Sequence, residues 1–312
     1  MYNTQPLMGM SQLVRRDITP AQAKIALQAP LIILSAPRSG SSLLFEQLTQ
    51  FSCVWNIGGE SHKVFRHFPH LRFENKQLDS ASLGEQHADP ATISLMREQF
   101  LFHLQDHQGN RLIEQKQNFK LSQGCLVEKT PRNALNIPFL LKVFPDAKFV
   151  FLQRKAEENI ASIIEAWKVG LETGRFATFP NLPGWDRKAW CFLLPPNWRT
   201  MLGKSLAEIA AFQWAQSNQT ILEQLSHLPE SRWTSLSYQQ FISNPQQQLN
   251  KIMQFAGLNV SHEHLDLSKM ALSKSTLSAP DENKWKLYQH EIVPLVDNLS
   301  ALVARLNNLN SG

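Results

Sequence analysis

A short apolar run that turns directly into a helix is the feature that most constrains the fold of this chain. The stretch PLIILSAPRSGSSLLFEQL covers residues 30–48. Its run 31–34 is typical of a short buried strand, and the apolar residues of 43–48 have helical spacing. Because the first N–H groups of a helix have no intrahelical partner, a helix that starts here directs several donors at whatever lies beyond the strand. The stretch therefore predicts a strand–loop–helix unit with an anion at the turn.

The loop of this unit adds side chains that suit an anion. Arg38 supplies a fixed fork of positive charge, Gly40 permits close backbone approach, and Ser39, Ser41 and Ser42 add hydroxyls. These groups predict a bound phosphate or sulfate, while a plain serine N-cap is the simpler alternative. The loop departs from the pattern G-x-x-x-x-G-K-[ST], because the first glycine is absent and no lysine follows Gly40. An ordinary ATPase or GTPase is therefore disfavoured.

The composition is that of a folded, mildly basic protein. The 312 residues are 43% hydrophobic and 18% charged, with a formal net charge of +5, which excludes a mostly disordered chain. The cations are scattered, so they suit an anionic ligand better than a nucleic acid. The three cysteines form no CxxC pair, which indicates a reduced compartment. Because no signal-peptide core and no run of about 18 apolar residues occurs, we expect a cytoplasmic protein without a membrane span.

Strand-like and helix-like segments alternate along the chain. This alternation predicts an α/β fold in which a central parallel β-sheet is flanked by helices on both faces. After the first strand and helix, the expected strands lie within 53–61 and at 125–131, 148–154 and 232–238. The expected helices lie near 91–107, at 133–144, 156–167, 205–225 and 245–258, and after 284–285.

We expect residues 1–312 to form a single domain with two distinctive segments. Residues 1–29 look like a leader with a short helix. Residues 170–203 are rich in aromatic residues and proline, which indicates a structured insertion rather than a linker. Its tryptophans Trp185, Trp190 and Trp198 would either cover the sheet edge as core residues or form the wall of an acceptor pocket. We favour an acceptor lid.

A second motif lies on the strand at 148–154. The stretch DAKFVFLQRKAEENIASII places Arg154 at the carboxyl end of a buried strand and Ser162 eight residues later, two turns into the next helix. Ligands of open parallel sheets bind at the carboxyl ends of the strands. We therefore expect Arg154 to lie beside the loop that carries Arg38.

At this point the sequence resembles the sulfotransferases that use 3′-phosphoadenosine 5′-phosphosulfate (PAPS). In that family a loop of the form P-[RK]-S-G-[ST]-[ST] binds the 5′-phosphosulfate, and a later strand that ends in Arg, with Ser eight residues on, binds the 3′-phosphate. The matching stretches here are APRSGSS and QRKAEENIAS, about 115 residues apart. One departure is visible, since the usual Arg-Asp-Pro is Arg154-Lys155-Ala156. The resemblance implies a P-loop-like nucleotide-binding architecture and a sulfonate transferase.

Weaker matches extend the resemblance to about residues 30–290. GGESHKVF looks like a protein-tyrosine sulfotransferase segment and implies Glu60 as the catalytic base, and EKTPR implies that Lys129 approaches the transferring sulfonate. YQQFISNP is similar to a segment that places Tyr238 near the nucleotide, with Gln239 in place of the usual Glu. The C-terminal stretch KSTLSAPDENKWK resembles a loop that closes over the cofactor. Its candidate contacts are Ser275, Ser278, Lys284 and Lys286.

The resemblance implies a sulfonate transfer, and this reaction sets the roles that the site residues must fill. Sulfonate transfer requires an in-line donor, a deprotonated nucleophile, and neutralised charge on the leaving phosphate. Glu60 would accept the proton of the hydroxyl, with His62 as a rival base, and Lys129 and Arg38 would stabilise the developing charge. No metal is required, and His62, His67 and His70 lack the H-E-x-x-H spacing. The product nucleotide would be 3′-phosphoadenosine 5′-phosphate (PAP).

Two other functions and several acceptors stay open at this stage. A small-molecule kinase could use the Arg38 loop for ATP, although the usual lysine is missing, and a non-catalytic nucleotide-binding protein could keep both phosphate sites. The hydroxyl acceptor could be a small molecule, a lipid, a glycan or a peptide. Glu157 and Glu158 open a helix, where they are most simply favourable partners of the helix dipole.

Overall fold

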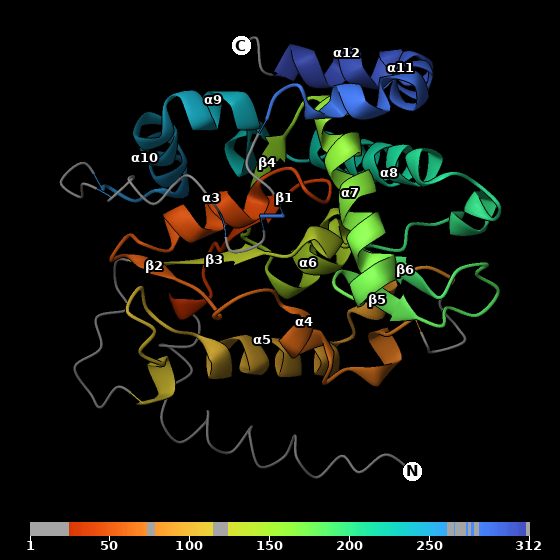
Figure 1. The fold of residues 1–312 in the computed structure, drawn as a ribbon. Coiled ribbons are helices and arrows are strands. Elements are labelled where there is room, and N and C mark those ends of the chain that lie inside the picture. The colour runs from red at the N-terminus through yellow and green to blue at the C-terminus, as the bar shows by residue number, and fades with distance from the viewer. Residues whose placement is uncertain are drawn as a thin grey trace.

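The chain folds into three layers, with a parallel β-sheet between two layers of helices (Figure 1). The structure is a computed structural model, and it describes residues 25–73, 79–114, 124–260, 265, 273, 276–277 and 281–309. Most of the expected leader therefore lies outside the described residues. The strands of the sheet are β1 Leu31–Leu34, β2 Val54–Trp55, β3 Cys125–Lys129, β4 Lys148–Gln153 and β7 Trp233–Ser237.

The order of the strands creates a crevice at the end of β1. The sheet runs β2-β3-β1-β4-β7, and every pairing in it is parallel. The chain leaves β1 toward one edge through β2 and β3 and then crosses to the other side of β1 to form β4. Such a reversal of strand order is where ligands bind in open α/β sheets. The expected fold class, a parallel sheet flanked by helices, is confirmed.

The alternation of side chains along the strands explains the two layers of helices. Leu31 and Ile33 face α3, α9 and α10, while Ile32 and Leu34 face the core formed with α5, α6, α7 and α8. Both faces of the strands are apolar, as parallel sheets require. The α-helices are α3 Ser41–Leu48, α4 His62–Phe65, α5 Pro90–His103, α6 Ile137–Val143, α7 Ala156–Thr173, α8 Leu206–Ser226, α9 Tyr238–Ser243, α10 Pro245–Ala256, α11 Gln289–Asn298 and α12 Ser300–Leu309.

Several boundaries differ from the expectation for local reasons. The helix expected at 133–144 is split into a 3-10 helix, η5 Pro131–Leu135, and α6, because Asn136 leaves helical geometry and α6 starts anew with Pro138 in its first turn, where proline is tolerated. α7 extends to Thr173, where Gly174 ends it with a left-handed φ of 78°. The remaining 3-10 helices are η1 Pro69–Leu71, η2 Glu85–His87, η3 Leu112–Glu114, η6 Trp198–Met201, η7 Glu230–Arg232 and η9 Lys284–Tyr288.

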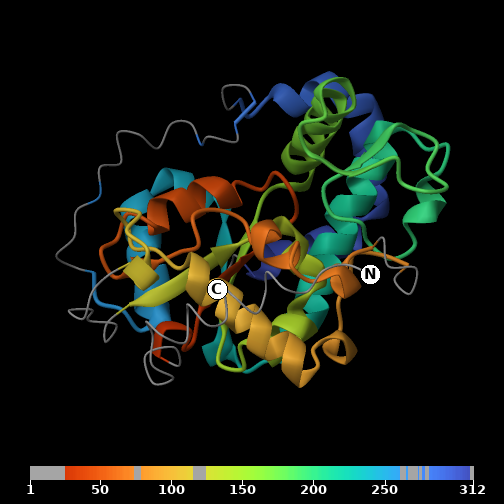
Figure 2. The same cartoon turned by 90° about the horizontal axis from the view of Figure 1, so that it is seen from below.

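The segment 170–203 contains the end of α7, a small antiparallel sheet and η6. Its strands are β5 Ala177–Pro180 and β6 Ala189–Cys191, and they lie on the side of α7 and α8, away from α9 and α10 (Figure 2). The rings of Trp185, Trp190 and Trp198 pack against one another, and Trp190 and Trp198 are fully buried. The tryptophans therefore form core, in line with the simpler of their two interpretations. Among the described residues, no helix has the length and apolarity that a membrane crossing needs.

Candidate functional site

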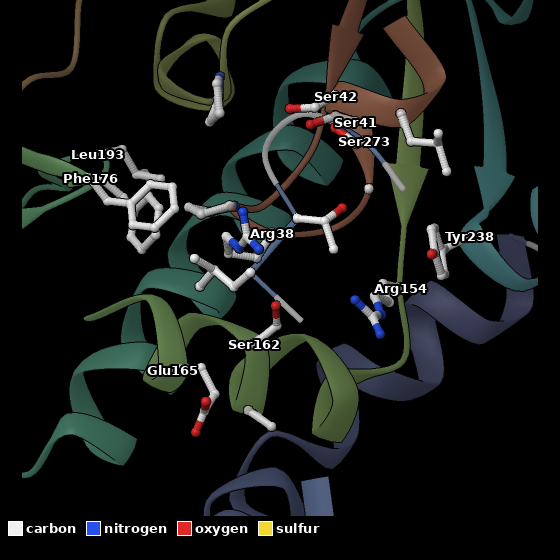
Figure 3. Close-up of a pocket in the computed structure, with 18 of the residues that line it drawn as sticks. Arg38, Ser41, Ser42, Arg154, Ser162, Glu165, Phe176, Leu193, Tyr238 and Ser273 are labelled. Carbon is white, nitrogen blue, oxygen red and sulfur yellow. The ribbon is translucent and has the colours of Figure 1, made fainter. Parts of the chain in front are cut away.

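The crevice predicted by the strand order holds a cavity of about 610 Å³. Its walls come from the loop between β1 and α3, from α7, from the β5–β6 hairpin and from the C-terminal segment (Figure 3). Segments far apart in the sequence thus meet at the carboxyl ends of β1 and β4. The cavity is large enough for a ligand of cofactor size.

The loop between β1 and α3 forms one wall in an unusual backbone conformation. Arg38 has φ 65° and Gly40 has φ 95°. Gly40 is the N-cap of α3 and brings no side chain that could cap the helix. The N–H groups at the start of α3 are therefore left for another acceptor. Ser41 and Ser42 line the cavity at the same place.

A buried clamp holds this loop against α7. The Ser39 hydroxyl lies 2.7 Å from Asn159 Oδ1, and Asn159 Nδ2 donates to the Pro37 carbonyl at 2.8 Å. Both Ser39 and Asn159 are buried. The Ser39 side chain is thus turned toward α7 and away from the cavity. Asn159 was not anticipated from the sequence, although a polar residue on an otherwise apolar helix face is the signal that could have identified it.

Arg154 lines the cavity from the end of β4, as the sequence predicts. Its Nε donates to Glu158 Oε2 at 3.1 Å, and its guanidinium lies 4.8 Å from the centre of the Tyr238 ring. Gln239 Nε2 donates to both oxygens of Glu158, at 3.3 and 3.2 Å. Glu158 is therefore more than a partner of the helix dipole, since its buried carboxylate orients Arg154. Its spacing of four residues from Arg154 is the sequence signal for this pair.

Positive charge is concentrated around the loop. Burial, the largest cause, and the nearby positive charges of Arg175 and Arg154 together lower the pKa of Arg38 to about 10. Because a pKa of about 10 lies well above neutral pH, Arg38 stays charged there. Arg38, which Arg154 and Arg175 repel, lies next to the N-terminus of α3, and this combination favours an anion.

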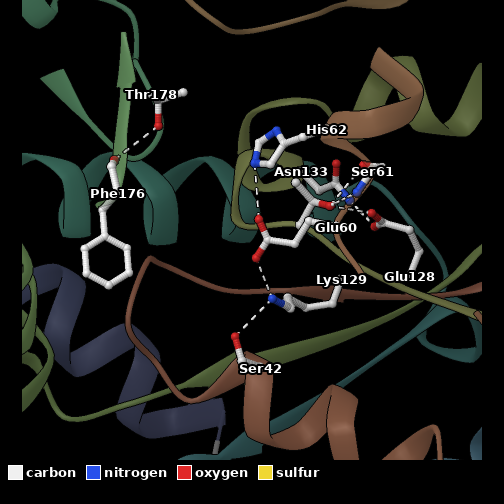
Figure 4. Close-up of polar contacts among 10 residues, drawn as sticks. Ser42, Glu60, Ser61, His62, Glu128, Lys129, Asn133, Phe176 and Thr178 are labelled. Carbon is white, nitrogen blue, oxygen red and sulfur yellow. Dashed lines mark hydrogen bonds and ion pairs between the residues drawn. The ribbon is translucent and has the colours of Figure 1, made fainter. Parts of the chain in front are cut away.

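A second polar group lies at the end of β3, next to the start of α3. Lys129 Nζ contacts Glu60 Oε1 at 2.6 Å and donates to Ser42 Oγ at 3.0 Å. His62 Nε2 lies 3.2 Å from the other oxygen of Glu60 (Figure 4). Glu60, His62 and Ser42 line the cavity, and Lys129 contacts two of these residues, Glu60 and Ser42. The structure thus brings Glu60, His62 and Lys129 together although 69 residues separate Glu60 from Lys129.

The charge state of Glu60 follows from opposing effects. Burial is the largest single effect and would raise the pKa of Glu60, but the hydrogen bond from His62 and the charge and hydrogen bond of Lys129 together lower it to about 2. Glu60 is therefore an ionised carboxylate at neutral pH. A carboxylate held against a lysine can accept a hydroxyl proton, and the lysine can stabilise negative charge nearby.

Glu128 is a further carboxyl group that was not anticipated from the sequence. It is fully buried beneath the turn that carries Glu60, and burial raises its pKa to about 7 despite favourable hydrogen bonds. Thr130 Oγ1 donates to its Oε1 at 2.6 Å, and Asn133 Nδ2 donates to its Oε2. A glutamate inside the strand CLVEK, which is otherwise apolar up to its last residue, is the signal that could have identified it.

Aromatic side chains of the β5–β6 region form the opposite wall of the cavity. Phe176 and Phe192 have ring centroids 5.4 Å apart, and the guanidiniums of Arg38 and Arg175 lie 5.2 and 4.9 Å from the centre of the Phe176 ring. Phe176 and Phe192 have φ values of 71° and 64°. Such values are outliers for bulky residues and cost free energy, and outliers of this kind gather at functional sites. Phe179 and Leu193 continue this wall.

The C-terminal segment forms the last wall. Lys284 lines the cavity and lies 3.6 Å from Glu165 of α7, and Tyr288 donates a hydrogen bond to the same Glu165. Lys286 belongs to η9, and no contact places it at the cavity among the described residues. Ser275 and Ser278 lie outside the described residues. Other cavity residues of this segment are Ser273, Thr276, Leu277, Asp281 and Trp285.

Most of the site residues predicted from the sequence therefore meet at one cavity. The residues that line it are Arg38, Gly40, Ser41, Ser42, Glu60, Arg154, Ser162, Tyr238 and Lys284. Among the described residues, no three His, Cys, Asp or Glu side chains form a group that could hold a metal ion. The donor set consists of arginines, hydroxyls and a helix N-terminus, which fits a ligand with two separate anionic groups.

Solved sulfotransferase structures resemble this fold. Sulfotransferase STF9 from Mycobacterium avium is 14% identical, with 93% of this chain and 81% of that chain covered and a TM-score of 0.50. A sulfotransferase from Alicyclobacillus acidocaldarius is 13% identical, with 89% and 96% covered and a TM-score of 0.47. Mouse sulfotransferase SULT7A1, solved with PAP, is 12% identical, with 95% and 94% covered and a TM-score of 0.40.

Sequence comparison assigns the family. A search of curated protein sequences finds no match to the chain. A model of the sulfotransferase family matches residues 30–191, which is more than half of the 312 residues. This range includes the β1–α3 loop, Glu60, Lys129 and Arg154. The chain therefore belongs to the sulfotransferase family.

Proposed function

We propose that this sulfotransferase uses PAPS as the sulfonate donor and a hydroxyl group as the acceptor. The observation that carries the proposal is that Arg38, Arg154 and Glu60 line one cavity, and that Glu60 is paired with Lys129. A donor with two phosphate positions and an acceptor that must lose a proton need this combination. PAPS, when bound, supplies the sulfonate that moves to the acceptor oxygen as the bond from sulfur to the phosphate oxygen breaks.

The donor would be held at two points. Arg154, oriented by Glu158 and Tyr238, and Ser162 would bind the 3′-phosphate. Arg38, Ser41, Ser42 and the N–H groups of α3 would bind the 5′ end. The position of Lys284 on the cavity wall supports a role for the C-terminal segment in covering the nucleotide. Ser275, Ser278 and Lys286 stay candidates from the family resemblance alone.

The acceptor would enter between Glu60 and the aromatic wall. Phe176, Phe179, Phe192 and Leu193 give this side of the cavity an apolar surface, which supports the role of segment 170–203 as an acceptor lid. An acceptor with an apolar body would bury that body here while its hydroxyl group approaches Glu60. The strained backbone of Phe176 and Phe192 is consistent with a functional constraint.

Glu60 would act as the general base and Lys129 as the electrostatic stabiliser. Glu60 is ionised, so it can accept the hydroxyl proton as the acceptor oxygen attacks. In the structure its basicity is low because Lys129 and His62 stabilise the carboxylate. Any anion that drew Lys129 away from Glu60 would raise the pKa of Glu60 and strengthen it as a base. His62, on the other oxygen of Glu60, is the alternative base.

The Glu60→Gln variant tests this assignment. We expect kcat to fall about 10²- to 10⁴-fold, the usual contribution of general base catalysis, while the affinity for PAP changes less than about threefold. The assay measures PAP release from PAPS with a panel of phenols, aliphatic alcohols, a tyrosine peptide and a sugar. His62→Gln is the matched control. A greater loss of kcat in His62→Gln than in Glu60→Gln would reassign the base to His62, and ATP-dependent transfer would favour a kinase.

A further inference from the structure

The buried carboxyl group of Glu128 lies outside the machinery described so far, and it belongs to a chain of hydrogen bonds that ends at the catalytic turn. Glu128 and Lys129 are neighbours on β3, so their side chains point to opposite faces of the sheet. Lys129 points toward α3 and Glu60, and Glu128 points beneath the turn that carries Glu60 and Ser61 (Figure 4). The strand β3 therefore carries both Lys129, which contacts Glu60, and Glu128, which lies beneath the turn with Glu60 and Ser61.

The direction of each hydrogen bond in this chain can be assigned. When Glu128 is ionised, Thr130 Oγ1 donates its single hydrogen to Glu128 Oε1, so the Thr130 oxygen accepts the contacts that it makes with Ser61. These are the Ser61 N–H at 2.8 Å and the Ser61 hydroxyl at 2.9 Å. All donors point toward Glu128. The carboxylate is thus the terminal acceptor that fixes Thr130, and Thr130 fixes Ser61.

Ser61 is adjacent to Glu60 and precedes α4, which begins with His62. Its backbone and side chain are both tied to Thr130, which adjoins Lys129 along the chain. A carboxylate and a lysine that must stay 2.6 Å apart need both of their backbones fixed. We propose that Glu128 is a positioning residue that, through Thr130 and Ser61, holds the Glu60–Lys129 pair in its catalytic arrangement. The proposal rests on the function proposed above.

The charged groups around Glu128 fit a carboxylate that changes state near neutral pH. Burial, the largest effect, raises the pKa of Glu128 to about 7, while the hydrogen bonds of Thr130 and Ser61 and the charge of Lys129 favour the ionised form and Glu60 opposes it. Arg132 on η5 is directed elsewhere, to the Leu71 carbonyl and the Phe65 ring. The ionised form accepts stronger hydrogen bonds than the neutral form. Protonation of Glu128 would therefore loosen Thr130 and Ser61 below neutral pH.

Substitutions at Thr130 test the link through kinetics. Thr130→Val keeps the shape of the side chain and removes the hydroxyl. We expect its kcat to fall about tenfold, while KM for PAPS and Kd for PAP stay within about twofold. Thr130→Ser retains the hydroxyl and should restore kcat. A loss confined to the affinity for PAP, or a Thr130→Val enzyme with unchanged kcat, would overturn the proposal.

A spectroscopic readout separates the proposal from a purely structural role. The amide resonance of Ser61 should shift with pH in the wild type, with a midpoint near 7 set by Glu128. The shift should vanish in Glu128→Gln, which does not titrate, and persist in His62→Gln, which removes the imidazole beside Glu60. An identical titration in Glu128→Gln would contradict the proposal.

These experiments distinguish a failure of the proposed function from a failure of the proposed role of Glu128. If the wild type transfers no sulfonate from PAPS but Ser61 titrates with Glu128, the proposed function fails and the network stands. If the wild type is active and both Thr130→Val and Glu128→Gln match its kcat and its Ser61 titration, the network has no positioning role and the proposed function stands.

Discussion

Gly40, between Arg38 and the first turn of α3, shows how a single residue shapes the proposed donor site. A Cβ at Gly40 would lie 2.5 Å from two ring carbons of Tyr238, and its φ of 95° disfavours any side chain. The glycine thus lets Tyr238, which contacts Arg154, lie directly on the loop. The loop and the Arg154 site are in contact through this ring.

Gly40→Ala should therefore disturb the site more than backbone strain alone would. We expect a loss of unfolding free energy of about 1–3 kcal/mol, with weaker binding of PAP. Gly174→Ala is the matched control, because Gly174 also has a positive φ, 78°, but no atom lies within 4 Å of a Cβ built there. Chemical denaturation and calorimetry give the two quantities. Equal effects on PAP affinity in both variants would exclude a role for the contact with Tyr238.

At the scale of elements, α7 organises the site. Its core face carries Ile160, Ile163 and Trp167, and its other side presents Glu158 and Ser162 to the cavity. This helix then leads through Gly174 into the β5–β6 hairpin. The same helix therefore connects the proposed donor site to the aromatic wall.

The aromatic wall gives a prediction for the hairpin as a unit. Phe176→Ala should raise KM for an apolar acceptor about tenfold and leave Kd for PAP nearly unchanged, because about 1.4 kcal/mol of apolar burial is lost on the acceptor side. Phe73→Ala is the control, since Phe73 packs on Phe179 and Trp198 behind the wall. Steady-state kinetics with an aliphatic alcohol measures the effect. Equal losses in both variants would mean that the hairpin acts only through its stability.

Some elements of the fold were predictable from the sequence alone, and others were not. The β1–α3 and β4–α7 units were predictable because buried strands, helical periodicity and the positions of Arg38 and Arg154 are local signals. The hairpin was not, since the apolar residues of 170–203 follow no period, and β6 and the loop before it pack on Trp167 of α7 through Trp190 and Trp185. The hydrogen bonds around Glu128 link Thr130 to Ser61, 69 residues away, and local sequence patterns cannot predict such a contact.

At the scale of the whole molecule, the two carboxyl groups beside Lys129 make stability depend on pH in opposite ways. The pKa of Glu60 is lowered to about 2, so its contribution is present above its ordinary value of 4.5 and is lost as the pH falls toward 2. The pKa of Glu128 is raised to about 7, so the folded state binds a proton more tightly and loses stability as the pH rises from 4.5 through 7.

Because the pKa of Glu128 is raised, the unfolding free energies of the wild type and Glu128→Gln should depend differently on pH. From pH 5 to pH 8.5 the unfolding free energy of the wild type should fall relative to that of the variant, by at least about 1 kcal/mol. Chemical denaturation at several pH values measures it. A constant difference between the two proteins would show that Glu128 keeps one charge state over this range. The expected loss is the energetic cost of an ionised carboxylate beneath the turn that carries Glu60.

Calorimetric binding of PAP, without magnesium, to the wild type and to Arg154→Ala, with ADP as the matched nucleotide, tests whether this sulfotransferase binds a 3′-phosphorylated nucleotide through Arg154. We expect the wild type to prefer PAP to ADP, and Arg154→Ala to lose that preference because the 3′-phosphate loses its charged partner, a loss of about tenfold or more. ADP affinity should change little. Equal binding of PAP and ADP by the wild type, or a preference for ATP that requires magnesium, would contradict the account.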